Sequence, residues 1–302
     1  MKILIAGSSG LIGSALIPAL NAQGRQVVRL VRQRVNGEEG VARWDPEAGK
    51  LDPGAFEGVD AVVNLAGENI GAARWTPERK ARLRESRVRG TTLLSETLAQ
   101  LAHPPEVLVS ASAVGYYGSR GDEALSEDKP PGTGFLPEVC VAWEAATEPA
   151  RQRGVRVVNL RIGMVLSGKG GALQPMASAF KMGVGGKLGD GRQFMGWIAI
   201  DDLTSAILHV IRDHTFNGPV NAVAPNPARN VEFTKALGKV LGRPTIFSMP
   251  AFAVRLVFGE MADALLLASA RVEPVRLLAG GFMFQYPELE GALRHVLGRV
   301  YT

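Results

Sequence analysis

The chain opens with MKILIAGSSGLIGS (residues 1–14), which predicts a short buried strand, a glycine-rich turn and the start of a helix. Glycines at positions 7, 10 and 13 allow a positive φ, bring backbone N–H groups close to a phosphate, and let the helix pack closely on the strand. The helix N-terminus adds the positive end of its dipole. The stretch therefore predicts a site for a dinucleotide pyrophosphate. A plain glycine turn is the alternative, because the G-x-x-G-x-x-G spacing is looser than G-x-G-x-x-G.

The end of the second predicted strand, residues 26–32, indicates which nucleotide is bound. An acidic residue here takes the ribose hydroxyls of NAD, whereas a nearby arginine accommodates the extra 2′-phosphate of NADP. The strand ends at Arg32, with Arg34 close behind and no carboxylate between them. A guanidinium is a planar, permanently charged group that binds phosphate well. The sequence thus favours NADP(H), and the alternative is that Arg32 only solvates a strand end.

Composition bounds the class of protein. With 302 residues, 46% of them hydrophobic, the chain can bury one large or two modest cores. The single Cys140 excludes an internal disulfide framework and a cysteine metal cluster, so we expect a reducing, cytoplasmic location and no metal. The first apolar run is too short for a signal peptide. The apolar segment 250–270 carries Arg255, Glu260 and Asp263, so it predicts an amphipathic helix pair rather than a membrane span.

The net charge of +5 is partly local. One predicted helix and its approach carry Arg74, Arg79, Lys80, Arg82, Arg84, Arg87 and Arg89. No aromatic residues that would stack on bases are interleaved with these charges. We therefore expect a solvated basic face that helps to attract anionic ligands, and no nucleic-acid partner.

Strand-like runs at 61–65, 107–110 and 155–160 alternate with helix-like segments at 76–101 and 137–153. This alternation predicts an α/β fold, a doubly wound parallel sheet with helices on both faces. Thr76 is a suitable cap for the long helix, because Pro77 follows it at the first helical position.

Beyond residue 161 the pattern changes. Glycine-rich runs at 168–171 and 183–191 predict mobile loops that close over a nucleotide pocket. Asp202 is expected to cap a helix over 203–211, and Asn230 a helix ending near Gly242. The predicted domains are a dinucleotide-binding domain over 1–224, with substrate-side loops at 166–195, and a small, mostly helical C-terminal domain over 225–302.

Short motifs follow one another along nearly the whole chain: GSSGLIG (7–13), NLAGE (64–68), RWT (74–76), SRV (86–88), SASAVGYYG (110–118), WE (143–144), RIGMVL (161–166), GWI (196–198), GEM (259–261), GFMF (281–284) and YP (286–287). Their order and spacing resemble the extended short-chain dehydrogenase/reductase superfamily, and within it an atypical epimerase-like group with its own C-terminal domain.

This resemblance implies a Rossmann fold and a set of NADP(H)-binding residues. The set comprises Gly7, Ser9, Gly10, Leu11, Ile12, Gly13, Arg32, Leu65, Ala66, Gly67 and Arg161. It also places Ser112 at the position of the superfamily's catalytic serine.

The chain departs from the superfamily at its Tyr-x-x-x-Lys pair, in which tyrosine moves the substrate proton and lysine lowers its pKa. Counting back from Glu144 places Leu136 and Cys140 at these two positions, and neither can do that work. Tyr116 and Tyr117 are the replacements that we consider, although either can also be a packing residue. Two further departures concern Arg87, where many relatives have asparagine, and Ala199, where histidine is common.

The sequence thus predicts an NADP(H)-dependent oxidoreductase or sugar-epimerase-like enzyme. Ser112 would orient a carbonyl or hydroxyl group of a small-molecule substrate, and Tyr116, Tyr117 or water would handle the proton. The alternative is a non-catalytic NADP(H)-binding protein that acts as a redox-state sensor or scaffold. We expect a monomer or homodimer with no membrane partner.

Overall fold

A central eight-stranded sheet organises the chain, whose computed structural model describes residues 1–32 and 39–299. The strand order is β13-β8-β6-β5-β1-β2-β3-β4. The strands are β1 (Lys2–Ala6), β2 (Gln26–Val31), β3 (Val41–Asp45), β4 (Lys50–Leu51), β5 (Ala61–Asn64), β6 (Val107–Ala113), β8 (Arg156–Ile162) and β13 (Gly218–Ala222). All neighbours are parallel except the short antiparallel pair β3–β4. The predicted doubly wound parallel sheet is confirmed.

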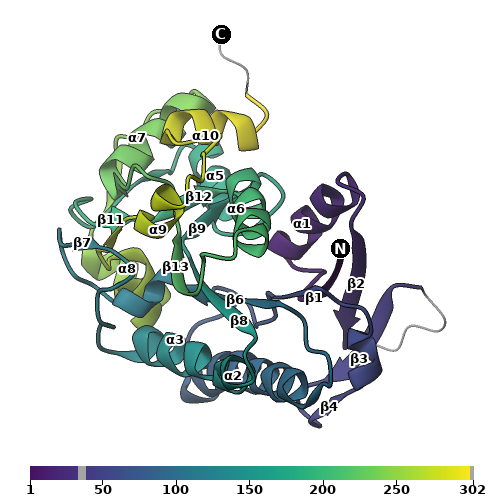
Figure 1. The fold of residues 1–302 in the computed structure, drawn as a ribbon. Coiled ribbons are helices and arrows are strands. Elements are labelled where there is room, and N and C mark those ends of the chain that lie inside the picture. Colours follow the sequence, from purple (N-terminus) through teal and green to yellow (C-terminus); the bar gives the residue numbers. More distant parts are fainter. Residues whose placement is uncertain (33–38, 300–302) are drawn as a thin grey trace.

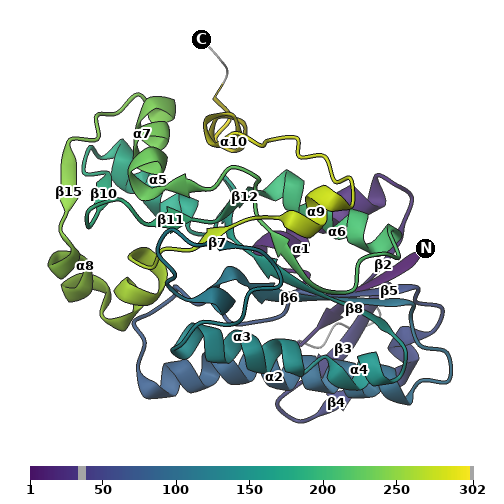
Figure 2. The ribbon, with the colours of Figure 1, turned by 60° about the vertical axis from the view of Figure 1, so that its left-hand side comes forward.

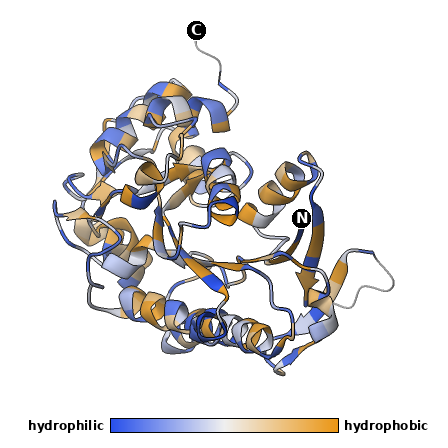
Figure 3. Ribbon diagram, viewed as in Figure 1, coloured by the Kyte–Doolittle hydropathy of each residue, from blue (hydrophilic) through white to orange (hydrophobic). Residues whose placement is uncertain are grey.

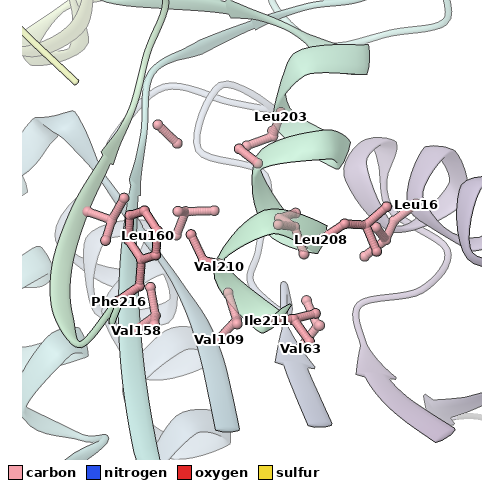
Figure 4. Close-up of a cluster of buried hydrophobic side chains, with 14 of the residues drawn as sticks. Leu16, Val63, Val109, Val158, Leu160, Leu203, Leu208, Val210, Ile211 and Phe216 are labelled. Atoms are coloured by element: carbon pink, nitrogen blue, oxygen red, sulfur yellow. The ribbon is translucent and has the colours of Figure 1, made fainter. Parts of the chain in front are cut away.

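Helices cover both faces of the sheet, as Figures 1 and 2 show. On one face lie α1 (Leu11–Asn21) and α6 (Ile200–Arg212), and on the other α2 (Pro77–Gln100), α3 (Phe135–Ala145) and α4 (Glu148–Gln152). Successive residues of a strand point to opposite faces. Ile3 and Ile5 accordingly join the core under α1 and α6, whereas Leu4 joins the core under α2 and α4. Figure 4 shows part of the first core, where Leu16 of α1 meets Leu208 of α6.

Much of the C-terminal half builds a second lobe beside the sheet (Figure 2). Its helices are α5 (Leu173–Lys181), α7 (Asn230–Leu241), α8 (Ala251–Phe258), α9 (Val275–Ala279) and α10 (Leu289–Val296). The lobe also contains short strands: β9 (Met164–Leu166), β10 (Gly186–Leu188), β11 (Phe194–Met195), β12 (Trp197–Ala199), β14 (Ala228–Arg229), β15 (Phe247–Met249) and β16 (Arg271–Val272), the last of which pairs with β7 (Ala124–Leu125) from earlier in the chain. A third core, with Phe180, Phe233 and Leu293, joins α5, α7 and α10.

This third core shows that residues 168–191, expected as glycine-rich loops, are partly regular structure. The segment contains α5 and β10, and β10 pairs in parallel with β15. The packing of Phe180 against α7 residues explains the difference, because an apolar face on the intervening stretch gives it a core to join. The boundary predicted near residue 225 stays a prediction.

Three local expectations are corrected. Pro149 divides the helix predicted over 137–153 into α3 and α4, because proline lacks the N–H that a continuous helix needs. The sixth helix begins at Ile200, and the Asp202 carboxylate instead accepts the backbone N–H groups of Gln285 and Tyr286 at 2.7 and 3.0 Å. Asn230 lies inside the first turn of α7, where its Oδ1 accepts the Leu188 N–H at 2.8 Å. The cap at Thr76 is confirmed, because its Oγ accepts the Arg79 N–H.

The segment predicted as an amphipathic helix pair forms α8 followed by a π-helical turn, Ala262–Leu266. Along α2 and α3, Figure 3 shows apolar residues interspersed with hydrophilic ones, as expected for helices that rest one face on a sheet. In the part of the chain that the structure describes, no helix is both long and apolar enough to cross a membrane.

Candidate functional site

The turn between β1 and α1 requires glycine at two positions. Gly7 has φ +81°, and a Cβ added there would lie 2.6 Å from the carbonyl carbon of Leu65. A Cβ on Gly13 would lie 2.4 Å from the Gly7 oxygen and 2.7 Å from the Ser8 Cα. These are backbone atoms, which cannot rotate away as a side chain can. The close approach of strand, turn and helix therefore depends on the absence of both side chains.

The same turn borders the place where the strand order reverses. β1 lies between β2 and β5, and ligands of doubly wound folds bind at such a switch point. The loop after β5, Leu65 to Gly67, passes directly over Gly7 and begins with a Leu65 N–H to Ala6 O bond of 2.9 Å. Helix α1 has Gly10 at its N-cap, with no side-chain cap and no acidic residue in its first turn. The N–H groups of that turn are thus available to an anion.

The remaining predicted cofactor residues lie around this turn. Ser9 and Gly10 are exposed at its tip, and Leu11 and Ile12 are partly exposed at the start of α1. Arg32 is exposed one residue beyond β2, and Arg34 lies outside the described residues. The glycine-rich segment packs beside the turn, because a Cβ on Gly171 would meet Leu11 Cδ2 at 2.9 Å.

Ser112 lies near the end of β6 and is 3% exposed. Its hydroxyl donates to Glu144 Oε1 of α3 at 2.7 Å. Arg161, directly opposite Ser112 on β8, binds the same carboxylate through two contacts of 2.9 and 3.0 Å. Burial alone would lower the pKa of Arg161, but the hydrogen bonds and charge of Glu144 outweigh burial and raise it. Ser112 is therefore part of a buried, charge-balanced group.

Arg161 also connects this group to the two tyrosines. Its Nη1 donates to the Tyr117 hydroxyl at 2.9 Å and to the Glu127 carbonyl at 3.1 Å. Its guanidinium carbon lies 3.5 Å from the centre of the Tyr116 ring, a close cation–π contact. These contacts place Arg161 beneath the tyrosine pair, and whether it also touches the cofactor stays a prediction.

The two tyrosines differ in what their hydroxyls can reach. Tyr117 is fully buried, and its hydroxyl donates to Asn221 Oδ1 at 2.7 Å. Burial raises the pKa of Tyr117, against the opposing effect of Arg161. Tyr116 is partly exposed, and its hydroxyl has no hydrogen-bond partner among residues 1–32 and 39–299. Of the pair, Tyr116 has the hydroxyl that is open to a ligand.

Leu136 and Cys140 are both buried on α3. The Cys140 thiol donates weakly to the Ala113 carbonyl at 3.7 Å. Burial, with a contribution from the charge of Glu144, raises the pKa of Cys140 to about 12. The thiol is therefore protonated at neutral pH and has the environment of a packing residue.

We expect Cys140 to resist alkylation in the folded protein. Its pKa is raised above the unfolded value of about 8.5. The neutral thiol thus contributes stability fully below that pH, and the contribution is lost as pH rises toward about 12. Iodoacetamide at pH 8, followed by mass spectrometry, should label the native protein far more slowly than protein unfolded in urea. Equal rates would contradict this assignment.

Sequence reasoning missed two side chains near the predicted site. Glu144 served only as a reference point within a Trp-Glu motif, and nothing local to it indicates a bond to Ser112. Arg87 was noted as part of the basic face and as a departure from related sequences, yet it lies against Gly67 of the loop after β5. In the described part of the chain, no three His, Cys, Asp or Glu side chains gather in a way that could hold a metal ion.

Two known families match successive parts of the chain. Residues 3–222 match the NAD dependent epimerase/dehydratase family. Residues 249–296 match a domain of unknown function, DUF1731. The first match contains the glycine turn, Ser112 and Arg161, and the second contains α8 to α10.

Similarity to individual proteins extends over nearly the full length of the chain. Epimerase family protein MT2273 of Mycobacterium tuberculosis is 46% identical over 298 residues, 98% of each chain. Human epimerase family protein SDR39U1 is 36% identical over 302 residues, which cover 98% of this chain and all of that one. A crystal structure of human SDR39U1 (isoform 2) with NADPH superposes with a TM-score of 0.89 at 34% identity, covering 99% of this chain and 100% of that chain.

Proposed function

Because the chain belongs to the NAD-dependent epimerase/dehydratase family, we propose that it is an NADP(H)-dependent oxidoreductase or sugar-epimerase-like enzyme. Its substrate would be a small molecule with a carbonyl or hydroxyl group at the reacting carbon. The observation that carries the proposal is the glycine turn at the β1–β5 switch point, where close backbone packing at Gly7 and Gly13 sets the uncapped first turn of α1 beside the loop after β5. The cofactor crevice would lie between this turn and that loop. The crystal structure of the human relative with NADPH supports the choice of cofactor.

The residues around the crevice fit such a cofactor. The N–H groups of the first turn of α1 would bind its pyrophosphate, and Leu65 to Gly67 would line its other side. Arg32 would bind the 2′-phosphate from the end of β2. When bound, a nicotinamide cofactor supplies a hydride to the substrate or accepts one from it.

Arg32 makes the nucleotide preference testable. We expect NADPH to bind more tightly than NADH, because the charge-assisted contact with the 2′-phosphate is worth roughly 1.5–3 kcal/mol. Arg32→Ala should remove most of that difference and leave NADH binding unchanged. Calorimetric titration of NADPH and NADH into the native protein and into Arg32→Ala measures these affinities. Equal affinities of the native protein, or an unchanged preference in the variant, would refute the role.

The proton is assigned to Tyr116 in this proposal, since its hydroxyl is the one of the pair left open. Tyr117 would instead hold the loop, because its hydroxyl is bound on both sides by Asn221 and Arg161. The expected role of Ser112 in orienting the substrate stays a prediction, and in the structure its hydroxyl donates to Glu144. We therefore propose that Ser112 positions Arg161 beneath Tyr116 through Glu144.

A second candidate is a non-catalytic NADP(H)-binding protein that senses redox state or acts as a scaffold. Leu136 and the protonated Cys140 favour it, because they leave α3 without the tyrosine and lysine that carry out proton transfer in the superfamily. The two candidates share the cofactor and differ in turnover. A cytoplasmic location, inferred from the single cysteine, and a monomeric or homodimeric state are part of the proposal.

A further inference from the structure

Arg87 is a cation beside the crevice that has no acidic partner of its own. It lies on α2, partly buried. Its Nη1 donates to the Leu83 carbonyl and its Nη2 to the Glu68 carbonyl, both at 2.9 Å. The nearest carboxylate, that of Glu68, is paired with Arg79. Within the described residues Arg87 itself is in no ion pair.

The guanidinium is held at the crevice wall. A Cβ on Gly67 would lie 3.4 Å from Arg87 Cζ, so the charged group rests against the backbone of the loop that passes over Gly7. Arg87 Cζ also lies 5.2 Å from the centre of the Trp143 ring. Its two carbonyl bonds, together with the contacts to Gly67 and Trp143, hold the group in place.

The positive charge of Arg87 is only partly compensated by its surroundings. Burial lowers the pKa of Arg87 and the charge of Arg79 acts in the same direction, against the opposing effects of Cys140 and Glu68. An arginine nevertheless keeps its proton in proteins, so a desolvated positive charge remains. Two carbonyl oxygens and an aromatic ring compensate such a charge less well than a carboxylate does. A ligand anion would complete the balance.

The geometry points to Arg87 as a binding site for an anionic oxygen, of a phosphate or a carboxylate, at the Gly67 edge of the crevice. The inference rests on the proposed function, because it takes this crevice to be the ligand site. The remaining N–H groups of the guanidinium supply the fork that recognises such oxygens. The positive charge is carried by α2 and lies near Cys140 of α3. The crevice would therefore contain a permanent cation, although α3 itself supplies no cation.

The oxygen could belong to the dinucleotide or to a second, anionic ligand, and two titrations separate these sources. The first measures the affinity for NADPH. The second measures the affinity for inorganic pyrophosphate, added to the free protein and to protein saturated with NADPH. Both are carried out on native protein, Arg87→Met and Arg84→Met. Arg84 is an exposed arginine on the same helix, so its variant makes the same change of charge away from the crevice.

We expect Arg87→Met to lower the affinity for one of these ligands by about tenfold. Arg84→Met should bind both ligands with the affinity of the native protein. The loss should shrink as ionic strength rises from about 50 to about 200 mM. A loss for NADPH assigns the oxygen to the dinucleotide, whereas a loss for pyrophosphate on the NADPH-saturated protein assigns it to a second ligand. If Arg87→Met does not fold, Arg87→Gln removes the charge and keeps a donor for the Glu68 carbonyl.

Unchanged affinities of the folded variant for both ligands would overturn the inference and leave Arg87 as a support for the loop. Failure of the native protein to bind NADPH would instead refute the proposed function. In that case the titration of the free protein with pyrophosphate still tests whether Arg87 binds an anion.

Discussion

Replacing Gly13 with alanine is expected to abolish measurable NADPH binding. The new Cβ would lie 2.4 Å from the Gly7 oxygen, so α1 must shift away from the turn. That shift moves the N–H groups that we assign to the pyrophosphate. Loss of two charge-assisted hydrogen bonds, at about 1.5–3 kcal/mol each, predicts an affinity lower by at least about 100-fold. Overpacking should also destabilise the fold by about 1–3 kcal/mol.

Gly10→Ala is the matched control in the same turn. Its Cβ would lie 3.3 Å from the Gly7 oxygen, and Gly10 has no positive φ, so a small adjustment accommodates the methyl group. Calorimetry with NADPH and urea unfolding of both variants give affinity and stability separately. If Gly13→Ala folds and binds NADPH within about threefold of the native protein, the turn does not hold the phosphate.

The sheet and its first turn were predictable because their signals are local. Continuous apolar runs such as residues 3–6 and 61–63 are typical of parallel strands buried on both faces. Glycines at 7 and 13 mark a close approach that no other residue permits. The Thr76-Pro77 start of α2 was found for the same reason, since its cap bond spans only three residues.

The expectations that failed depend on contacts between distant residues. Asp202 has the sequence context of a helix cap, yet its carboxylate binds N–H groups 83 and 84 residues further along the chain. Asn230 similarly binds the backbone of Leu188, 42 residues before it. Short polar side chains accept a local or a distant N–H equally well, so the tertiary fold decides between them.

The candidate site shows the same division. A strand over 107–110 with a serine beyond it was foreseeable, but the partner of Ser112 was not. That partner depends on the register of β6 against β8, which sets Arg161 opposite Ser112, and on α3, which brings in Glu144. Tyr116 and Tyr117 are likewise indistinguishable in sequence. The 3₁₀ turn Val114–Tyr117 sends one ring into the core and leaves the other partly exposed.

Tyr116→Phe is expected to reduce turnover by about 10²–10⁴-fold with little change in NADPH affinity. The substitution removes the one hydroxyl that we assign to the proton and keeps the ring over Arg161. The measurement is stopped-flow loss of nicotinamide absorbance, with a carbonyl substrate found by screening. Cys140→Ala should keep its rate of hydride transfer, because a buried thiol with a pKa of about 12 holds its proton throughout.

Tyr117→Phe and Ser112→Ala separate chemistry from support. Tyr117→Phe leaves Asn221 Oδ1 without its buried donor and removes one of the two acceptors of Arg161 Nη1, so it should lower stability by about 1–3 kcal/mol. Ser112→Ala should lower turnover less than Tyr116→Phe, because it acts only through Glu144 and Arg161. Normal turnover of Tyr116→Phe beside an inactive Ser112→Ala would return the reacting group to Ser112. If screening yields no substrate while NADPH raises the melting temperature, the non-catalytic candidate is favoured, because binding then occurs without hydride transfer.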